Sequence, residues 1–350
     1  MSTIYDVVNS KMTSVRWKKE DQDRKPFLLE AWFPTEKQLG TELTYFKGKR
    51  PNVRPLDLSA YDVPALPLDR EDFEKVTTDI PFFKNKMSIN EKIRQELIKV
   101  LATNNQAYID AVLNQIYNDN KTLLEDATLT REIMRAMLLT TGVVAMESNG
   151  QAIAYDYGVP AENKKTASWN NPETSTPIED IRGYMDEIEA KTGVRPDSII
   201  MNRATYGKMI KSKALRNSVL ALTSVLGGAV TVSDSRVKQY LLDELQATLY
   251  IYDKGYYNKA EKKMVKFFAD DVFVVLPSVA VGKTVFGTTP EEADLMSGNT
   301  LADVSIVNTG IAVSTEKIAL PVNLITWASE IVLPSFEGMD SVYNIKYTAE

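Results

Sequence analysis

The first 86 residues combine aromatic rings with prolines spread along their length, and this combination constrains the fold more than any other feature. The segment has little regular periodicity, and each proline fixes φ and removes a backbone donor. A disordered linker would be poor in aromatic residues. We therefore expect an ordered, extended segment whose rings pack against its own body or against neighbouring chains. The prolines are Pro26, Pro34, Pro51, Pro55, Pro64, Pro67 and Pro81.

Charge is distributed unevenly along the chain. Residues 16–54 carry ten basic and six acidic side chains, whereas the whole chain of 350 residues has a formal net charge of −6. A basic segment on an acidic body could bind nucleic acid or the acidic body of the next identical subunit. The second interpretation is favoured because acids are mixed in, as at Lys18-Lys19-Glu20-Asp21, and no dense basic tract forms.

The chain contains no Cys and no His. This excludes disulfides, thiolate metal sites, cysteine nucleophiles, Ser-His-Asp triads and histidine-bound zinc. No stretch reaches the roughly 20 apolar residues that span a bilayer, and the first residues are unlike a signal peptide, so we expect no membrane partner. Carboxylate chemistry, backbone phosphate sites and proteins that function by assembling remain open.

A change of pattern at residue 88 marks the start of helical structure. Ser88-x-x-Glu91 is a capping box, and apolar residues at helical spacing follow it. One helix over residues 89–118 would be about 45 Å long, which indicates an elongated body. Asn104-Asn105 could break this helix. A second helix is expected over residues 129–140.

Tight turns and helix caps organise the rest of the chain. Asn149-Gly150, between apolar runs at 143–146 and 152–155, predicts a β-hairpin. Thr176-Pro177-Ile178-Glu179 predicts a helix start, and this helix should end at Gly193. The other expected elements give an α+β pattern: strands near 198–201, 247–253, 264–268, 272–276 and through much of 301–350, and helices near 203–212 and 235–245.

Two motifs suggest chemistry but have simpler structural explanations. Gly282-Lys283-Thr284 is like the end of a phosphate-binding P-loop, yet Pro277 stands where that motif needs a glycine. Asp253 and Asp270-Asp271 could bind a divalent cation or act as acid and base. A turn before the apolar strand at 272 explains the aspartate pair more simply. We therefore expect no catalytic, cofactor or metal site.

From residue 131 onward, several motifs follow one another in a specific order. They are Arg131-Glu132-x-Met134-x-x-x-Leu138-x-Thr140-Thr141-Gly142, Tyr155-Asp156-Tyr157-Gly158, Trp169, Pro177-Ile178-Glu179-Asp180-Ile181, Thr192-Gly193-x-x-Pro196 before Ile199-Ile200-Met201-Asn202, Phe273-Val274-Val275-Leu276-Pro277, and Phe286-Gly287-Thr288-Thr289-Pro290-Glu291-Glu292. Their order and spacing resemble the lambda-type major capsid protein E family of tailed bacteriophages. The resemblance covers most of the chain and is firmest over residues 85–290.

The resemblance implies a Hong Kong 97-like phage capsid fold of the α+β class. This fold has an extended N-terminal arm, an E-loop hairpin, a peripheral domain with a long spine helix, and an axial domain. We accordingly expect the N-terminal arm at 1–40, the E-loop at 41–86, the peripheral domain with spine helix and hairpin at 87–176, the axial domain at 177–310, and return strands of the peripheral domain at 311–350.

The implied function is that of a major capsid (head) protein of a bacteriophage or prophage. Such a protein self-assembles into hexamers and pentamers that form the icosahedral shell of the virion, and it would assemble in the cytoplasm of the bacterial host. The implied partners are other copies of the chain, a scaffolding protein, a portal and, in some shells, a decoration protein. The chain starts almost directly with the arm, so the scaffolding protein is expected to be separate. Double-stranded DNA would be enclosed without sequence-specific binding, because an acidic body repels it.

Two alternative functions stay open. A shell protein of an encapsulating compartment would share this fold, and a cargo enzyme encoded nearby would favour it. A carboxylate- or metal-dependent hydrolase would use Asp253 and Asp270. For a shell protein, the expected contacts between subunits come from arm and E-loop anchors, namely Trp32, Phe33, Arg50 and Arg54.

Overall fold

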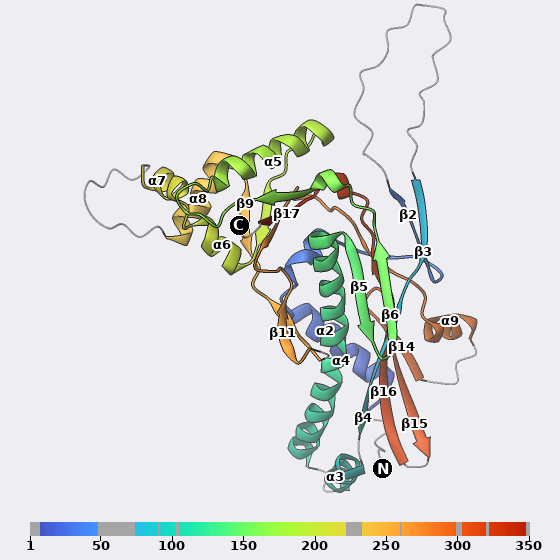
Figure 1. The fold of residues 1–350 in the computed structure, drawn as a ribbon. Helices are drawn as coiled ribbons and strands as arrows, with labels where there is room; N and C mark the ends of the chain where they lie inside the picture. Colours follow the sequence, from blue (N-terminus) through green and yellow to red (C-terminus); the bar gives the residue numbers. More distant parts are fainter. Residues whose placement is uncertain are drawn as a thin grey trace, which may run out of the picture. The chain divides into compact units, whose positions relative to one another are not determined.

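The computed structural model describes residues 8–47, 74–89, 91–102, 105–221, 233–259, 261–298, 303–319 and 322–347. Helices and strands are mixed along the chain, as expected for the α+β class (Figure 1). The chain divides into two compact units. Unit 1 comprises Met1–Thr44, Thr77–Met134 and Lys283–Ser335, and unit 2 comprises Tyr45–Val76, Arg135–Gly282 and Phe336–Glu350.

The elements follow in chain order. The helices are α2 (Ser10–Asp23), α3 (Glu91–Ala102), α4 (Gln106–Thr141), α5 (Pro177–Thr192), α6 (Arg203–Met209), α7 (Lys213–Ala221), α8 (Asp234–Leu245) and α9 (Pro290–Ser297). The strands are β1 (Thr35–Lys37), β2 (Glu42–Lys47), β3 (Glu74–Asp79), β4 (Phe82–Ile89), β5 (Val143–Ser148), β6 (Gln151–Asp156), β7 (Lys164–Ala167), β8 (Ser198–Met201), β9 (Thr248–Ile251), β10 (Gly255–Asn258), β11 (Lys263–Lys266), β12 (Val272–Leu276), β13 (Thr284–Phe286), β14 (Asp303–Val307), β15 (Ile311–Ala319), β16 (Val322–Pro334) and β17 (Tyr343–Tyr347).

Unit 1 is built on a six-stranded sheet with β16 at its centre. The strand order is β1-β13-β16-β15-β14, and β4 also pairs with β16. One end of β16, Val332–Pro334, pairs with β13, while Leu324–Ile331 pair with β4. On its other edge β16 pairs with β15. A single long strand therefore pairs with β15, which directly precedes it, and with β13 and β4 from earlier parts of the sequence.

The helices after β4 differ from the predicted ones. α3 ends at Ala102 and α4 begins at Gln106, so residues 89–118 do not form one helix. Asn105 accepts a hydrogen bond from the backbone N–H of Ala107 at 3.2 Å, which caps the start of α4. The predicted helix at 129–140 is the last part of α4, whose 36 residues extend about 54 Å.

The predicted capping box at Ser88 is wrong. Ser88 lies in β4 opposite Ile325, because pairing with β16 continues as far as Ile89. Long-range strand pairing thus decides the conformation of a residue whose local sequence favours a helix start.

Unit 2 contains a five-stranded sheet with the order β7-β17-β12-β8-β9. Helices α5, α6, α7 and α8 gather around it (Figure 1). Its buried cluster includes Trp169 and Phe273, whose rings stack with centroids 4.5 Å apart. The Trp169 indole N–H donates to Asp180 in the first turn of α5 at 2.8 Å, which ties this helix to the core.

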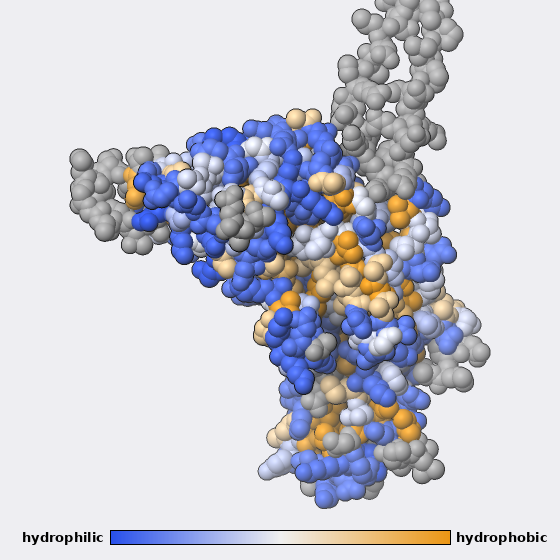
Figure 2. All heavy atoms as spheres, in the orientation of Figure 1, coloured by the Kyte–Doolittle hydropathy of each residue, from blue (hydrophilic) through white to orange (hydrophobic). Residues whose placement is uncertain are grey.

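Two predicted elements of unit 2 are confirmed. β5 and β6 form the hairpin around Asn149-Gly150, whose φ values of 51° and 73° match a turn with two left-handed residues. On the face seen in Figure 2, apolar residues gather over this hairpin. α5 starts at Pro177 and ends at Thr192 with Gly193 as its left-handed cap, as predicted, although the Thr176 hydroxyl makes no capping bond to the backbone.

The two units divide the chain differently from the predicted segments. β13, α9 and β14 fall within the predicted axial segment at 177–310 but belong to unit 1. β17, expected among the return strands, joins the sheet of unit 2. The assignment of arm, E-loop, peripheral and axial names to these segments stays a prediction.

We expect Phe273→Ala to destabilise unit 2 by about 3–5 kcal/mol, because it removes a fully buried ring and leaves a cavity beside Trp169. Denaturant unfolding of the purified chain measures this change. Tyr257→Ala is the control: the Tyr257 side chain is 56% exposed, so its loss should stay within about 0.5 kcal/mol. Equal effects of both substitutions would contradict the core assignment.

Candidate functional site

The segment after α2 lies on unit 1 with its large side chains buried. Trp32 is 3% exposed, Phe33 0% and Leu29 0%. The rings therefore pack against the chain's own body, one of the two placements expected for this segment. A contact of Trp32 or Phe33 with a neighbouring subunit stays a prediction. The other predicted anchors, Arg50 and Arg54, lie outside the described residues.

Strand β1 fixes this segment to the edge of the sheet in unit 1. It runs parallel to β13, with Thr35 opposite Thr284 and Lys37 opposite Phe286. The N–H of Thr284 donates to the Pro34 carbonyl at 2.8 Å, and its hydroxyl donates to the Phe33 carbonyl at 3.0 Å. Hydrogen bonds to the main chain thus fix β1 and the residues directly before it to β13.

The motif at residues 286–292 closes over the turn that follows β1. The N–H of Thr288 donates to the Gly40 carbonyl at 2.8 Å, and the Gly40 N–H donates to the Thr288 hydroxyl at 3.1 Å. A Cβ on Gly287 would lie 2.6 Å from a methyl of Ile331 and 2.8 Å from the Gly40 carbonyl. Only glycine allows the two backbones to come this close.

Lys37 connects β1 to the start of α9. Its ammonium lies 2.5 Å from the carboxylate of Glu292 and donates to the Gly287 carbonyl at 2.8 Å. Glu292 is only 6% exposed, and its N–H donates to the Thr289 hydroxyl, which caps the helix. A carboxylate in the first turn of α9 also suits the positive end of the helix dipole.

The neighbouring carboxylate, Glu291, binds the sheet. It accepts hydrogen bonds from Lys84 of β4 at 3.0 Å and from Ser329 of β16 at 2.9 Å. Burial alone would raise the pKa of Glu291, but its backbone hydrogen bond, Lys84 and Ser329 together lower it below the ordinary value. Two successive glutamates of one motif thus fix α9 to three strands: Glu291 to β4 and β16, and Glu292 to β1.

A buried ion pair lies between α4 and the sheet of unit 1. The guanidinium of Arg131 is 2.6 Å from the carboxylate of Glu330, and the two side chains are 8% and 3% exposed. Arg131 also donates to the Thr128 hydroxyl at 3.1 Å and stacks over the Phe286 ring at 5.3 Å. The next residue, Glu132, accepts the Leu29 N–H at 3.1 Å. α4 therefore holds both β16 and the N-terminal segment.

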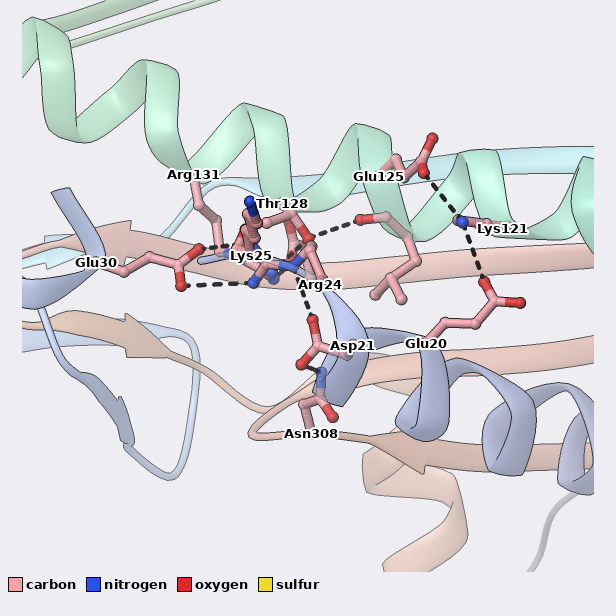
Figure 3. A network of polar contacts seen from close by, with 12 residues as sticks. Glu20, Asp21, Arg24, Lys25, Glu30, Lys121, Glu125, Thr128, Arg131 and Asn308 are labelled. Carbon is pink, nitrogen blue, oxygen red and sulfur yellow. Dashed lines mark hydrogen bonds and ion pairs between the residues drawn. The ribbon is translucent and has the colours of Figure 1, made fainter. Parts of the chain in front are cut away.

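The end of α2 contacts α4 through charged groups, as Figure 3 shows. Lys121 of α4 lies 3.8 Å from both Glu20 and Glu125. Asp21 accepts hydrogen bonds from Arg24 at 3.1 Å and from Asn308 at 2.9 Å. Glu20, Asp21, Arg24, Lys121 and Glu125 border a cavity of about 290 Å³, and with Asp23 its lining has four acidic and two basic side chains.

The base of the predicted E-loop is held in unit 2 by aromatic contacts. The rings of Tyr45 in β2 and Tyr157 lie 6.1 Å apart, and Tyr157 meets Phe336 edge-on at 6.5 Å. Burial raises the pKa of Tyr157, so its phenol stays neutral. β2 and β3 pair in a two-stranded sheet next to this cluster.

The residues proposed for catalysis are engaged in structural contacts. Asp253 and Asp270 both face Lys266, at 3.5 and 2.8 Å, and Asp270 also accepts a hydrogen bond from Asn202. Within the described residues, no group of three or more acidic side chains is placed to hold a metal ion. In the same part of the chain, no helix has the length and apolar character needed to cross a bilayer.

The P-loop-like residues also have structural roles. Thr284 opens β13 and bonds the Phe33 carbonyl, while Lys283 lies 2.5 Å from the Glu36 carboxylate of β1. These contacts join the start of β13 to β1 and to the residues before it.

Comparison with protein families finds phage major capsid protein E over residues 15–308, which is most of the chain. The chain belongs to this capsid protein family. The family resemblance expected from the ordered motifs is therefore confirmed.

Two solved structures are similar to this capsid protein over nearly its whole length. One is a prophage protein of Escherichia coli CFT073 assigned as a capsid protein, with 15% identity, a TM-score of 0.59, and coverage of 97% of this chain and 99% of that chain. The other is a phage-related protein of Bordetella bronchiseptica RB50, with 11% identity, a TM-score of 0.59 and 97% coverage of both chains. No curated protein gives a significant match. The fold is the Hong Kong 97-like phage capsid fold.

Sequence reasoning missed the polar contacts that anchor the N-terminal segment of the capsid protein. Arg131, Glu132, Glu291 and Glu292 were noted only as parts of motifs. The positions of Arg131 and Glu132 gave a clue that both are buried, because they directly precede apolar helix residues that face a core. Their partners could not be identified, since Glu330 is 199 residues from Arg131.

We expect Arg131→Met to destabilise unit 1 by about 3–5 kcal/mol, because it leaves the Glu330 carboxylate buried without its cation. The double variant Arg131→Met with Glu330→Leu should recover most of this loss, since no buried charge remains. Denaturant unfolding of the parent chain, the two single variants and the double variant gives the coupling free energy between Arg131 and Glu330. A double variant as unstable as the sum of the singles would contradict a direct pair.

We expect Glu291 to make unit 1 sensitive to acid. Its pKa in the folded chain lies below the ordinary value of 4.5, so its stabilising effect is complete above pH 4.5. This effect is lost as pH falls through the lowered folded pKa. Glu291→Gln should therefore flatten the fall of stability below pH 4.5, measured by thermal unfolding across pH. Glu96→Gln, on the exposed side of α3, is the control and should leave the profile unchanged.

Proposed function

We propose that this chain self-assembles into hexamers and pentamers that tile the icosahedral shell of a phage or prophage head and enclose its DNA. The observation that carries the proposal is membership of the phage major capsid protein E family over residues 15–308. Contacts between different surfaces of identical chains generate rings when the rotation closes. Rings of six and five can then tile a closed shell.

The anchorage in unit 1 supports this proposal. Main-chain bonds at β1, the Gly287 contact and the Lys37–Glu292 pair set the direction in which the N-terminal segment leaves the sheet. In unit 2, the Tyr45–Tyr157 contact does the same for the base of the β2-β3 pair. A segment whose base is held in one place can reach a neighbouring subunit at a reproducible position.

We assign the roles of the chain's segments on the same basis. The N-terminal arm is residues 1–40, the E-loop 41–86, the peripheral domain 87–176 with return strands at 311–350, and the axial domain 177–310. Arg50 and Arg54 are the proposed contacts of the E-loop with a neighbouring subunit. Trp32 and Phe33 would join such a contact only if the arm leaves its own body, because both are buried there.

The partners proposed for the shell are a scaffolding protein, a portal and, in some shells, a decoration protein. DNA inside would be enclosed without sequence-specific binding, since a chain with a net charge of −6 repels it. Assembly would take place in the cytoplasm of the bacterial host. An encapsulating compartment is the second candidate of the same class, and a cargo enzyme encoded nearby would favour it.

We propose that the chain has no enzymatic activity. Asp253 and Asp270, the candidates for a hydrolase, share the cation of Lys266. The double variant Asp253→Asn with Asp270→Asn should form shells as the parent chain does. A metal-dependent turnover that this variant loses would instead favour the hydrolase.

Assembly is tested by sedimentation and negative-stain microscopy of the purified chain over a broad concentration range. We expect hexamers, pentamers or closed shells. A stable monomer at all concentrations, with the N-terminal segment protected from protease, would contradict the proposal.

A further inference from the structure

Helix α2 lies along strand β14 and packs against β14 and β15 of the sheet in unit 1. At the start of the helix, the backbone N–H and the hydroxyl of Ser10 both donate to Asp303, each at 2.8 Å. Near its end, Asp21 accepts a hydrogen bond at 2.9 Å from Asn308, which follows β14 directly (Figure 3). The helical and the extended stretch between these two contacts both span about 17 Å, so the two elements run side by side in the same direction.

The side of α2 that faces the sheet consists mostly of short polar side chains. Its buried residues are Ser10, Thr13, Ser14 and Trp17, which recur at the spacing of one helix face. Only Trp17, the last of the four, is large enough to fill the space between a helix and a sheet. Serine and threonine form the first half of the contact and fill less of that space, although protein interiors are close-packed.

A polar row of the sheet lies below the start of α2. Asp303 of β14 is directly opposite Thr315 of β15, and Thr315 is directly opposite Thr326 of β16. Side chains at directly opposite positions lie on the same face of a sheet. All three therefore lie on the face that Ser10 contacts, where Thr315 is 8% exposed and Thr326 1%.

Three hydroxyls at this contact are buried with no hydrogen-bond partner among the described residues. They belong to Thr13, one turn after Ser10, and to Thr315 and Thr326 of the polar row. A buried hydroxyl without a partner costs free energy, and most buried polar groups bond to protein or to ordered water. Three such hydroxyls at one contact indicate a shared partner, and this partner must be small because the three residues are nearly inaccessible.

We propose that ordered water is bound between α2 and the sheet, where it is shared by the hydroxyls of Thr13, Thr315 and Thr326. A buried water makes about three hydrogen bonds to groups that otherwise have no partner. A threonine hydroxyl can donate or accept, so three of them can hold such a water in a defined orientation. Asp303, exposed on the edge strand β14, adds acceptor oxygens where solvent reaches the row. The site does not depend on the shell function proposed above.

Thr326→Val tests this site, because valine keeps the shape of threonine and removes the hydroxyl. If water is bound, the change removes one of its partners and should lower the urea midpoint of unfolding by about 0.3 M or more. If the hydroxyl is simply unpaired, the same change removes a buried polar group and should raise the midpoint. Thr248→Val, at an exposed position of β9, is the control for the strand preference of valine. A rise of the Thr326→Val midpoint beyond that of the control would overturn the proposal.

The double variant Thr315→Val with Thr326→Val tests whether the water is shared. We expect its midpoint to fall by less than the sum of the two single changes, because the second replacement removes a hydroxyl that has already lost its partner. Additive shifts of the midpoint would overturn a shared site.

A crystal structure of the purified chain, at a resolution that shows ordered water, gives the direct readout. We expect water density about 2.8 Å from at least two of the three hydroxyl oxygens. A direct bond between the Thr315 and Thr326 hydroxyls, or from the Thr13 hydroxyl to a backbone carbonyl, with no water density between α2 and the sheet, would overturn the proposal. Either result leaves the shell function as it stands.

Discussion

The close approach of three backbone segments at Gly287 is the constraint on which the anchorage of unit 1 depends. The Gly287 N–H donates to the Ile331 carbonyl of β16 at 2.8 Å. A Cβ added to Gly287 would lie only 2.8 Å from the Gly40 carbonyl. Because no side chain intervenes, β1, β13 and β16 can share one sheet, and Lys37 can reach Glu292. A main-chain joint fixes the direction of the segment around β1 better than flexible side chains would.

Local signals in the sequence predicted local structure well. The Asn149-Gly150 hairpin and the helix from Pro177 to Gly193 occur where expected, because left-handed turn residues and helix ends depend on residues adjacent in the chain. The prediction of a helix start at Ser88 was wrong for the opposite reason. Its capping box was compatible with a helix start, but pairing of β4 with β16 determines the conformation there, and that strand lies more than 200 residues later.

The sequence pointed to some residues that anchor the N-terminal segment, but not to the residues that they contact. Residues 286–292 stood out as a motif, yet the partner of Glu292 is 255 residues away in β1. Trp32 and Phe33 show a different limit. Burial against its own body and burial against a neighbour remove the same apolar area, so one sequence does not distinguish them. The structure places both rings in unit 1 and leaves α2, which the sequence did not single out, with exposed apolar residues.

The absence of histidine has a consequence for how a shell of this chain responds to pH. Among the described residues, every clear pKa shift moves the pKa of a side chain further from pH 7. The carboxylates of Asp270 and Glu291 have lowered pKa values, mainly through Lys266 in the first case and, despite burial, through the backbone, Lys84 and Ser329 in the second. Burial raises the pKa of Tyr184 to about 12. These groups therefore keep a fixed charge from about pH 5 to 8, the range in which histidine would titrate. The Lys266–Asp270 contact therefore keeps both charges across that range, because the pKa of Lys266 is raised and that of Asp270 is lowered, so this contact does not respond to protons near neutral pH.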